Sequence, residues 1–225
     1  MKQTLLFSNI IGNICEDDES CVFNDYMNEY LTKQNIKNKN LVFINAKGLG
    51  GEEYYLKNII RCFKNINIDF NKIYEIDENT KLEDKNNIDF KNSILFLMGG
   101  DPIVQYNEIK RLGFNKLIHD FDGLVIGFCA GAINLSKISI ITSDEDFLQP
   151  LSYEGIERIN LVIEPHYNQT ESAIELIKRN NEIQDFANQY KTEIIALPDE
   201  SIIVAENEDI KVYGETVRFN YEKCN

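Results

Sequence analysis

The chain has 225 residues, of which 43% are hydrophobic and 27% are charged, which is typical of a globular protein with one sizeable core. Its formal net charge of −14 at pH 7 argues against a nucleic-acid partner, because binding to phosphates needs a basic surface. No apolar stretch is as long as a signal-peptide core or a membrane span. We therefore expect one domain over residues 1–225, in the cytoplasm, with no nucleic-acid or membrane partner.

The first half of the chain alternates short apolar runs with amphipathic stretches. The runs that we expect to be strands are Thr4–Ile11, Asn40–Ala46, Phe70–Ile76, Ser93–Met98 and Gly123–Phe128. The stretches that we expect to be helices are Asp25–Lys33, Glu52–Asn65 and Pro102–Leu112. The apolar runs are continuous, as in strands that helices cover on both faces. This alternation predicts an α/β fold with a doubly wound, mostly parallel sheet.

The second half continues the alternation and then changes character. Strands are expected at Ile138–Thr142 and Asn160–Glu164, and a long helix at Thr170–Tyr190. The apolar residues that recur at helical spacing in this helix are Ile174, Ile177, Ile183, Phe186 and Tyr190. The final runs, rich in β-branched residues and joined by short turns, are Glu193–Leu197, Ser201–Ala205, Lys211–Tyr213 and Thr216–Phe219. They predict a C-terminal antiparallel ribbon at the edge of the sheet.

The pentapeptide Gly127-Phe128-Cys129-Ala130-Gly131 places a thiol between an expected strand and a stretch able to start a helix. This is the layout of the G-x-S-x-G turn that holds the nucleophile of α/β-hydrolases, with cysteine in place of serine. The glycines leave room for a strained turn, and the backbone N–H of Ala130 would point at a developing oxyanion. The alternative interpretation is a buried structural cysteine in a glycine-flanked turn.

Two histidines are candidates for the base that would activate Cys129. His166 follows the strand expected at Asn160–Glu164, so it would lie at the same edge of the sheet as the thiol. His119 precedes a strand and would lie at the opposite edge, so we expect it to be structural. The acid that would orient His166 stays open among three carboxylates that follow expected strands: Asp144, Asp199 and Glu200.

A second glycine-containing turn, Gly99-Gly100-Asp101, closes the strand expected at Ser93–Met98. Two glycines would let the backbone approach a ligand closely, and Gly100 would supply a second N–H to an oxyanion. An ordinary strand-to-helix turn explains the glycines nearly as well.

The cysteines and glycines also bear on cofactors. The five cysteines are odd in number and form no C-x-x-C pair, so neither a disulfide framework nor a zinc site is expected. The chain has neither G-x-G-x-x-G opening a βαβ unit nor G-x-x-x-x-G-K-[ST], so nucleotide binding has no support. We therefore expect no metal and no cofactor.

Taken together, these segments resemble the peptidase E (aspartyl dipeptidase) and cyanophycinase family of serine peptidases. The segments that carry the resemblance are Gly99-Gly100-Asp101, Gly127–Ala132, Pro165-His166-Tyr167-Asn168 and Leu197-Pro198-Asp199. The spacing between Cys129 and His166 and the C-terminal run that ends Ile210–Gly214 are also similar. The resemblance covers roughly residues 90–220, and the N-terminal part in pattern only.

The resemblance implies a class I glutamine-amidotransferase-like, flavodoxin-like fold and hydrolysis of a small peptide or amide substrate. By resemblance, Cys129 takes the place of the nucleophile, His166 that of the base and Asp199 that of the acid. Asp144 matches a further aspartate considered important in the family. The residues that would form the oxyanion hole are Gly100 and Ala130, and those that would bind substrate are Gly99, Asp101 and Asn168.

The chain departs from the family pattern in two places. Cysteine replaces serine as the nucleophile, and the segment Asn168–Ser172 has no arginine to hold an aspartyl side chain. We expect a Cys-His-acid hydrolase that cleaves a peptide or isopeptide bond through an acyl-enzyme. One alternative is a glutamine amidotransferase, which would carry glutamate in place of Asn168. Another is a non-hydrolytic or redox-sensing protein with a reactive Cys129. A homodimer is one candidate for the assembly.

Overall fold

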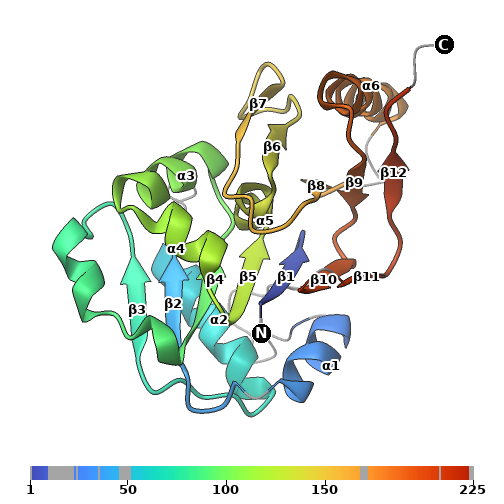
Figure 1. Ribbon diagram of the computed structural model, residues 1–225. Coiled ribbons are helices and arrows are strands. Elements are labelled where there is room, and N and C mark those ends of the chain that lie inside the picture. Colours follow the sequence, from blue (N-terminus) through green and yellow to red (C-terminus); the bar gives the residue numbers. More distant parts are fainter. Residues whose placement is uncertain are drawn as a thin grey trace.

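The computed structural model describes residues 2–9, 23, 25–34, 36–45, 52–167, 172–207 and 209–222. The described residues form a central sheet of seven strands in the order β11-β10-β1-β5-β4-β2-β3 (Figure 1). Its parallel strands are β1 (Gln3–Phe7), β5 (Leu124–Phe128), β4 (Ser93–Leu97), β2 (Asn40–Ile44) and β3 (Ile73–Ile76). Its antiparallel edge consists of β10 (Ile202–Glu206) and β11 (Asp209–Tyr213). The expected α/β fold with a mostly parallel sheet is confirmed.

Helices cover both faces of this sheet, which explains why its strands are continuously apolar. On one face lie α1 (Asp25–Lys33) and α2 (Glu52–Asn65), and on the other α3 (Pro102–Arg111), α4 (Phe114–Asp120) and α5 (Ala130–Leu135). Leu5 and Phe7 of β1 pack into the first core, whereas Leu6 between them packs into the second. Because successive side chains of a strand point to opposite faces, one strand serves both cores.

A second sheet stands beside the first, at the upper right of Figure 1. It consists of β8 (Val162–Pro165), β9 (Ile194–Leu197) and β12 (Val217–Phe219), and α6 (Ala173–Tyr190) packs on it. Strands β8 and β9 are parallel, so their carboxyl ends lie at the same edge. A separate antiparallel hairpin is formed by β6 (Ile138–Ile141) and β7 (Leu151–Glu154).

The two smaller sheets correct the expectation of a single sheet. The runs at Ile138–Thr142, Asn160–Glu164 and Glu193–Leu197 contain strands, but none of these strands joins the seven-stranded sheet. The expected antiparallel ribbon is formed by Ser201–Ala205 and Lys211–Tyr213, without the runs before and after them. Pairing depends on contacts between segments far apart in the chain, and the pattern of one segment does not contain that information.

The expected helices at 25–33 and 52–65 have the observed bounds, whereas α4 and β7 were not expected. Two short 3₁₀ turns, Leu82–Asn87 and Phe90–Asn92, were not expected either. Along α6, Ile183 and Phe186 are buried, but Ile174 is 81% and Ile177 60% exposed. The apolar stripe of α6 therefore covers the second sheet only over the later turns of the helix.

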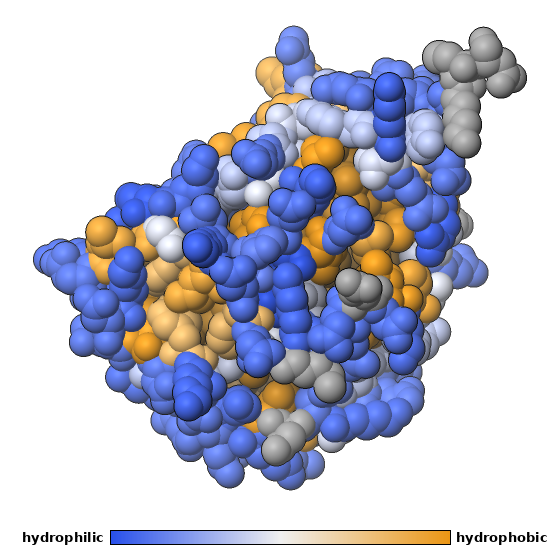
Figure 2. Space-filling model, viewed as in Figure 1, coloured by the Kyte–Doolittle hydropathy of each residue, from blue (hydrophilic) through white to orange (hydrophobic). Residues whose placement is uncertain are grey.

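On the face seen in Figure 2, hydrophilic residues predominate and apolar residues show between them in separate patches. None of the helices in the described part of the chain combines the length and the apolar character that crossing a membrane requires.

Candidate active site

Cys129 stands between β5 and α5 in a backbone conformation that few residues adopt. Its φ is 47° and its ψ is −108°, outside the regions that are comfortable for a residue with a side chain. Its N–H donates to the carbonyl of Phe7 (3.0 Å), and its own carbonyl accepts from the N–H of Ile133 (3.0 Å). The chain therefore passes from strand to helix within one residue, which is the geometry of a nucleophile elbow.

The glycines on either side of the elbow let α5 pack directly on the sheet. A Cβ on Gly131 would overlap the main-chain carbonyl of Leu97 in β4. A Cβ on Gly127 would lie 2.9 Å from the Cα of Ala132 and 2.7 Å from the side chain of Leu135. Glycine at these two positions therefore permits the close approach that holds Cys129 at the edge of the sheet.

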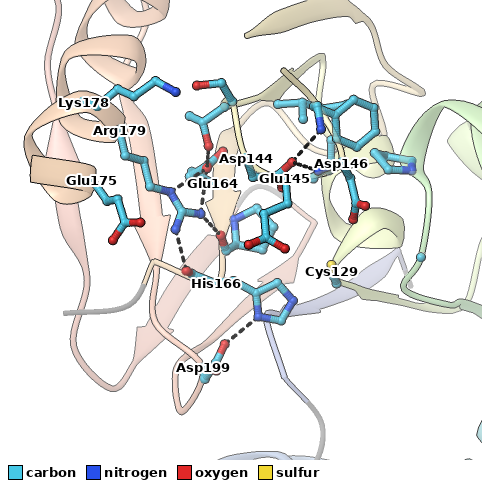
Figure 3. Close-up of a pocket in the computed structure, with 18 residues that line it drawn as sticks. Cys129, Asp144, Glu145, Asp146, Glu164, His166, Glu175, Lys178, Arg179 and Asp199 are labelled. Atoms are coloured by element: carbon cyan, nitrogen blue, oxygen red, sulfur yellow. Dashed lines mark hydrogen bonds and ion pairs between the residues drawn. The ribbon is translucent and has the colours of Figure 1, made fainter. Parts of the chain in front are cut away.

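His166 follows β8 directly and lies in the same pocket as Cys129 (Figure 3). Its φ of 52° is left-handed; its N–H donates to the hydroxyl of Ser8 (3.1 Å) and its carbonyl accepts from Nη1 of Arg179 (2.8 Å). Imidazole Nδ1 lies 2.7 Å from Oδ1 of Asp199. In Figure 3 the sulfur of Cys129 lies on the side of the ring opposite Asp199. The arrangement is thiol, imidazole, carboxylate.

The surroundings of His166 favour its protonated form. Burial opposes the charge, but the hydrogen bonds to Asp199 and Cys129, together with their charges, raise the pKa of His166 from 6.5 to about 10. The hydrogen bond from His166 in turn holds the pKa of Asp199 below its ordinary 3.8, although burial acts in the opposite direction. An ion pair between the imidazolium and the carboxylate is therefore favoured over a wide pH range.

We expect the Asp199→Asn variant to lose stability in a pH-dependent manner. A group whose pKa is higher in the folded state than in the unfolded state stabilises the fold. This contribution is complete at pH values below the unfolded-state pKa and disappears as the pH rises through the folded-state pKa. For His166 the contribution is complete below 6.5 and is lost towards about 10. The variant should therefore lose more free energy of unfolding at about pH 6 than at about pH 10.

Urea unfolding of both proteins at the two pH values measures this difference. The effect should be modest, because the His166 side chain is 43% exposed and solvent screens its charge. Equal losses at both pH values would contradict the ion pair.

A buried ion pair fixes the backbone on which His166 stands. Glu164 is 3% exposed, and its Oε1 accepts from Nε (3.0 Å) and Nη2 (2.8 Å) of Arg179 and from the hydroxyl of Thr142 (2.6 Å). Burial raises the pKa of the Glu164 carboxyl, while Arg179 and Thr142 act against this rise. The same guanidinium donates to the carbonyls of Pro165 (2.7 Å) and His166 (2.8 Å). Arg179 thus ties α6 to the end of β8.

Cys129, His166 and Asp199 line one pocket of about 810 Å³, a volume usual for sites that bind small ligands. The loop after β6 and the first turns of α6 form its walls, as Figure 3 shows. Charged residues on these walls include Asp144, Glu145, Asp146, Glu175 and Lys178. Among the described residues, no group of three His, Cys, Asp or Glu side chains is arranged to hold a metal ion.

The turn after β4 packs against the nucleophile elbow. A Cβ on Gly99 would lie 3.2 Å from the Cβ of Cys129 and closer still to the ring of Phe128. Gly100 has a φ of 127°, which favours glycine, and it lines the pocket. Ala130 is the first residue of α5, so its N–H is among those that a helix leaves without an intrahelical acceptor.

Asp199 is the candidate acid that contacts His166. Asp144 also lines the pocket, but its Oδ1 accepts from the N–H groups of Asp146 (2.9 Å) and Phe147 (2.7 Å) in its own loop. Glu200, the third candidate, has an exposed side chain. The position of the carboxylate at Nδ1 therefore favours Asp199 as the residue that orients the imidazole.

Two further residues that the sequence singled out do not line the pocket. The Asp101 carboxylate caps α3, accepting from two backbone N–H groups, and Asp101 is not among the residues that line the pocket. His119 lies on α4, where its Nδ1 is 3.2 Å from the carbonyl of Ile156. Asn168 lies outside the described residues.

Three residues that shape the site were not singled out from the sequence: Ser8, Glu164 and Arg179. A signal existed for Glu164, since a carboxylate within a buried apolar strand needs a cationic or hydrogen-bonding partner. Ser8 gave no such signal, because a serine after a strand is ordinary.

Comparison with known proteins shows which family the chain belongs to. A family model described as peptidase family S51 matches residues 12–213. The chain belongs to peptidase family S51. Peptidase E of a Nostoc species is 25% identical to this S51 protein over 206 residues, which are 83% of this chain and 80% of that protein. An uncharacterized peptidase of Listeria monocytogenes, Lmo0363, is 30% identical over 87 residues, which are 36% of this chain but only 42% of that protein.

A solved structure shares the fold. A 1.5 Å crystal structure of a Listeria monocytogenes protein assigned as a peptidase E matches this S51 protein with a TM-score of 0.66 and 19% sequence identity. The match covers 95% of this chain and 98% of that one. The family model and the Nostoc relative confirm the resemblance to the peptidase E family inferred from the sequence motifs, and the solved structure confirms the fold.

Proposed function

We propose that this S51 protein is a peptidase E-like hydrolase that cleaves a peptide or isopeptide bond in a small substrate, with Cys129 as its nucleophile. The observation that carries the proposal is Cys129 in a strained elbow, in the same pocket as the pair formed by His166 and Asp199. A base that lies beside a nucleophile and is oriented by a third group is the arrangement that activates a thiol.

In the first half of the proposed reaction, the sulfur of Cys129 attacks the carbonyl carbon of the scissile bond. The oxyanion that forms accepts hydrogen bonds from the N–H groups of Ala130 and Gly100, each of which contributes about 3–4 kcal/mol. His166 holds the thiol proton and donates it to the leaving amine as the C–N bond breaks. A thioester on Cys129 remains.

In the second half, water hydrolyses the thioester. His166, now neutral, takes a proton from the attacking water, and the C–S bond breaks as the carboxylic acid product forms. The proton returns to the pair of Cys129 and His166. Asp199 keeps Nδ1 of the ring engaged in both halves, so that the other nitrogen stays directed at the reacting atoms.

A substrate panel tests the proposal. It contains α- and β-aspartyl dipeptides together with neutral and basic dipeptides, each with a free and an acetylated N-terminus. We expect the wild-type protein to release amino acids from at least one class, as measured by chromatography, and to lose this activity when Cys129 is alkylated. Turnover that survives complete alkylation of Cys129 would contradict the proposed nucleophile. Release of ammonia from glutamine, with no cleavage of the panel, would favour the amidotransferase alternative.

A further inference from the structure

Residues at the end of β1 contact both Cys129 and Asp199 of the proposed triad. The carbonyl of Phe7 accepts from the N–H of Cys129 (3.0 Å), and the side chain of Asn9 hydrogen-bonds to Asp199. Cys129 follows β5 of the seven-stranded sheet, whereas His166 and Asp199 follow β8 and β9 of the three-stranded sheet. The triad is therefore assembled from two sheets, and the end of β1 lies where they meet.

Ser8 makes the central contact of this junction. It is fully buried, and its hydroxyl accepts from the N–H of His166 (3.1 Å) and donates to the carbonyl of Leu197 (2.5 Å), the last residue of β9. One oxygen atom thus joins the end of β1 to the ends of β8 and β9. The carbonyl of Leu197 also accepts from the N–H of Tyr167 (3.2 Å), so the loss of the hydroxyl would fall mainly on His166.

The backbone of His166 needs such a contact. Its φ of 52° costs free energy in a residue with a side chain and persists only where the surroundings hold it. Ser8 holds the N–H side of this residue, and Arg179 holds the carbonyl side. Without the hydroxyl, the N–H of His166 would lose its partner, and its peptide plane would depend on the hydrogen bond from Nη2 of Arg179 to the carbonyl of Pro165 (2.7 Å). The imidazole would then move relative to the thiol.

We propose that Ser8 is a positioning residue that holds the imidazole of His166 in place beside the sulfur of Cys129. The inference rests on the function proposed above, since it assigns Ser8 to the same triad. Hydrogen-bond partners that orient metal ligands typically change activity by about 10- to 100-fold when removed, and we expect a group that orients a catalytic imidazole to act on a similar scale. Ser8 should therefore affect the reactivity of Cys129 although it does not touch the sulfur.

The test is the rate at which iodoacetamide alkylates Cys129 in the full chain between about pH 5.5 and about pH 9, followed by peptide mass mapping. We expect Ser8→Ala to lower the rate at about pH 6 by about tenfold and to shift the pH profile towards that of His166→Ala. A purely structural serine would lower the melting temperature and leave the profile of the folded protein unchanged.

Matched variants separate the hydroxyl from its surroundings. Ser93 is also buried, and its hydroxyl also donates to a main-chain carbonyl, that of Asp89 (2.5 Å), but it lies at the end of β4 away from the site. Ser93→Ala should keep the wild-type profile. The side chains introduced by Ser8→Thr and Ser8→Val have the same shape and differ only in the hydroxyl. Comparing these two variants therefore tests the role of the hydroxyl even if Ser8→Ala does not fold. The threonine variant should react faster than the valine variant.

The outcomes are distinguishable. If His166→Ala slows alkylation but Ser8→Ala does not, or if the threonine and valine variants react alike, the role of Ser8 is wrong and the proposed function stands. If His166→Ala reacts like the wild type, the pairing of Cys129 with His166 fails, and the proposed function fails with it.

Discussion

Replacing Cys129 by alanine is expected to lower kcat/KM by at least about 10⁴-fold, because a triad without its nucleophile retains only binding and oxyanion stabilisation. The measurement is hydrolysis of the panel substrate that the wild type cleaves best. Cys62→Ala is the matched control, since Cys62 is also a cysteine but lies on α2 and is buried in the core between this helix and the sheet. It should lose about 1 kcal/mol of stability and keep its turnover. A Cys129→Ala variant with full activity would reject this residue as the nucleophile.

The second large effect is expected on stability. Gly131→Ala should lower the free energy of unfolding by about 3 kcal/mol, because the added Cβ would overlap the backbone of Leu97. Strand β4 is held by neighbours on both sides, so α5 must move instead. That movement would displace Cys129 and lower its reactivity as well. Urea unfolding and the rate of alkylation by iodoacetamide measure the two effects.

Gly113→Ala is the control for this variant. Gly113 has a φ of 65° and precedes α4, and a Cβ there would meet no atom within 4 Å. Alanine should therefore cost about 1 kcal/mol for conformation alone and leave the reactivity of Cys129 unchanged. If both variants lost the same stability and kept the same reactivity, the close approach of α5 to β4 would not be what holds the elbow.

Much of the main sheet could be predicted because its strands carry their own signal. Strands such as Asn40–Ile44 and Ser93–Leu97 are buried on both faces, so they can be recognised in the sequence as nearly continuous apolar runs. Helices α1 and α2 carry an equally local signal in their amphipathic spacing. The division of the remaining strands among three sheets was missed, because β6, β8 and β9 differ from the main strands only in their distant partners.

Some parts of the candidate site could likewise be predicted from the sequence, and others could not. The elbow at Cys129 could be found because its glycines and the thiol are adjacent in the chain, and His166 because it follows a strand. The choice among three carboxylates could not be made, because contact with His166 depends on the parallel register of β8 and β9. The contact between Ser8 and His166 joins segments 158 residues apart, and no spacing rule covers it.

The central claim is that Cys129 and His166 act together. Its most direct test is labelling with limiting iodoacetamide at about pH 6, where an isolated thiol is almost wholly protonated and unreactive. In the wild-type protein, peptide mapping should find most of the label on Cys129, and the His166→Ala variant should lose this selectivity. Label spread evenly over the five cysteines, or equal labelling of Cys129 in both proteins, would contradict the account.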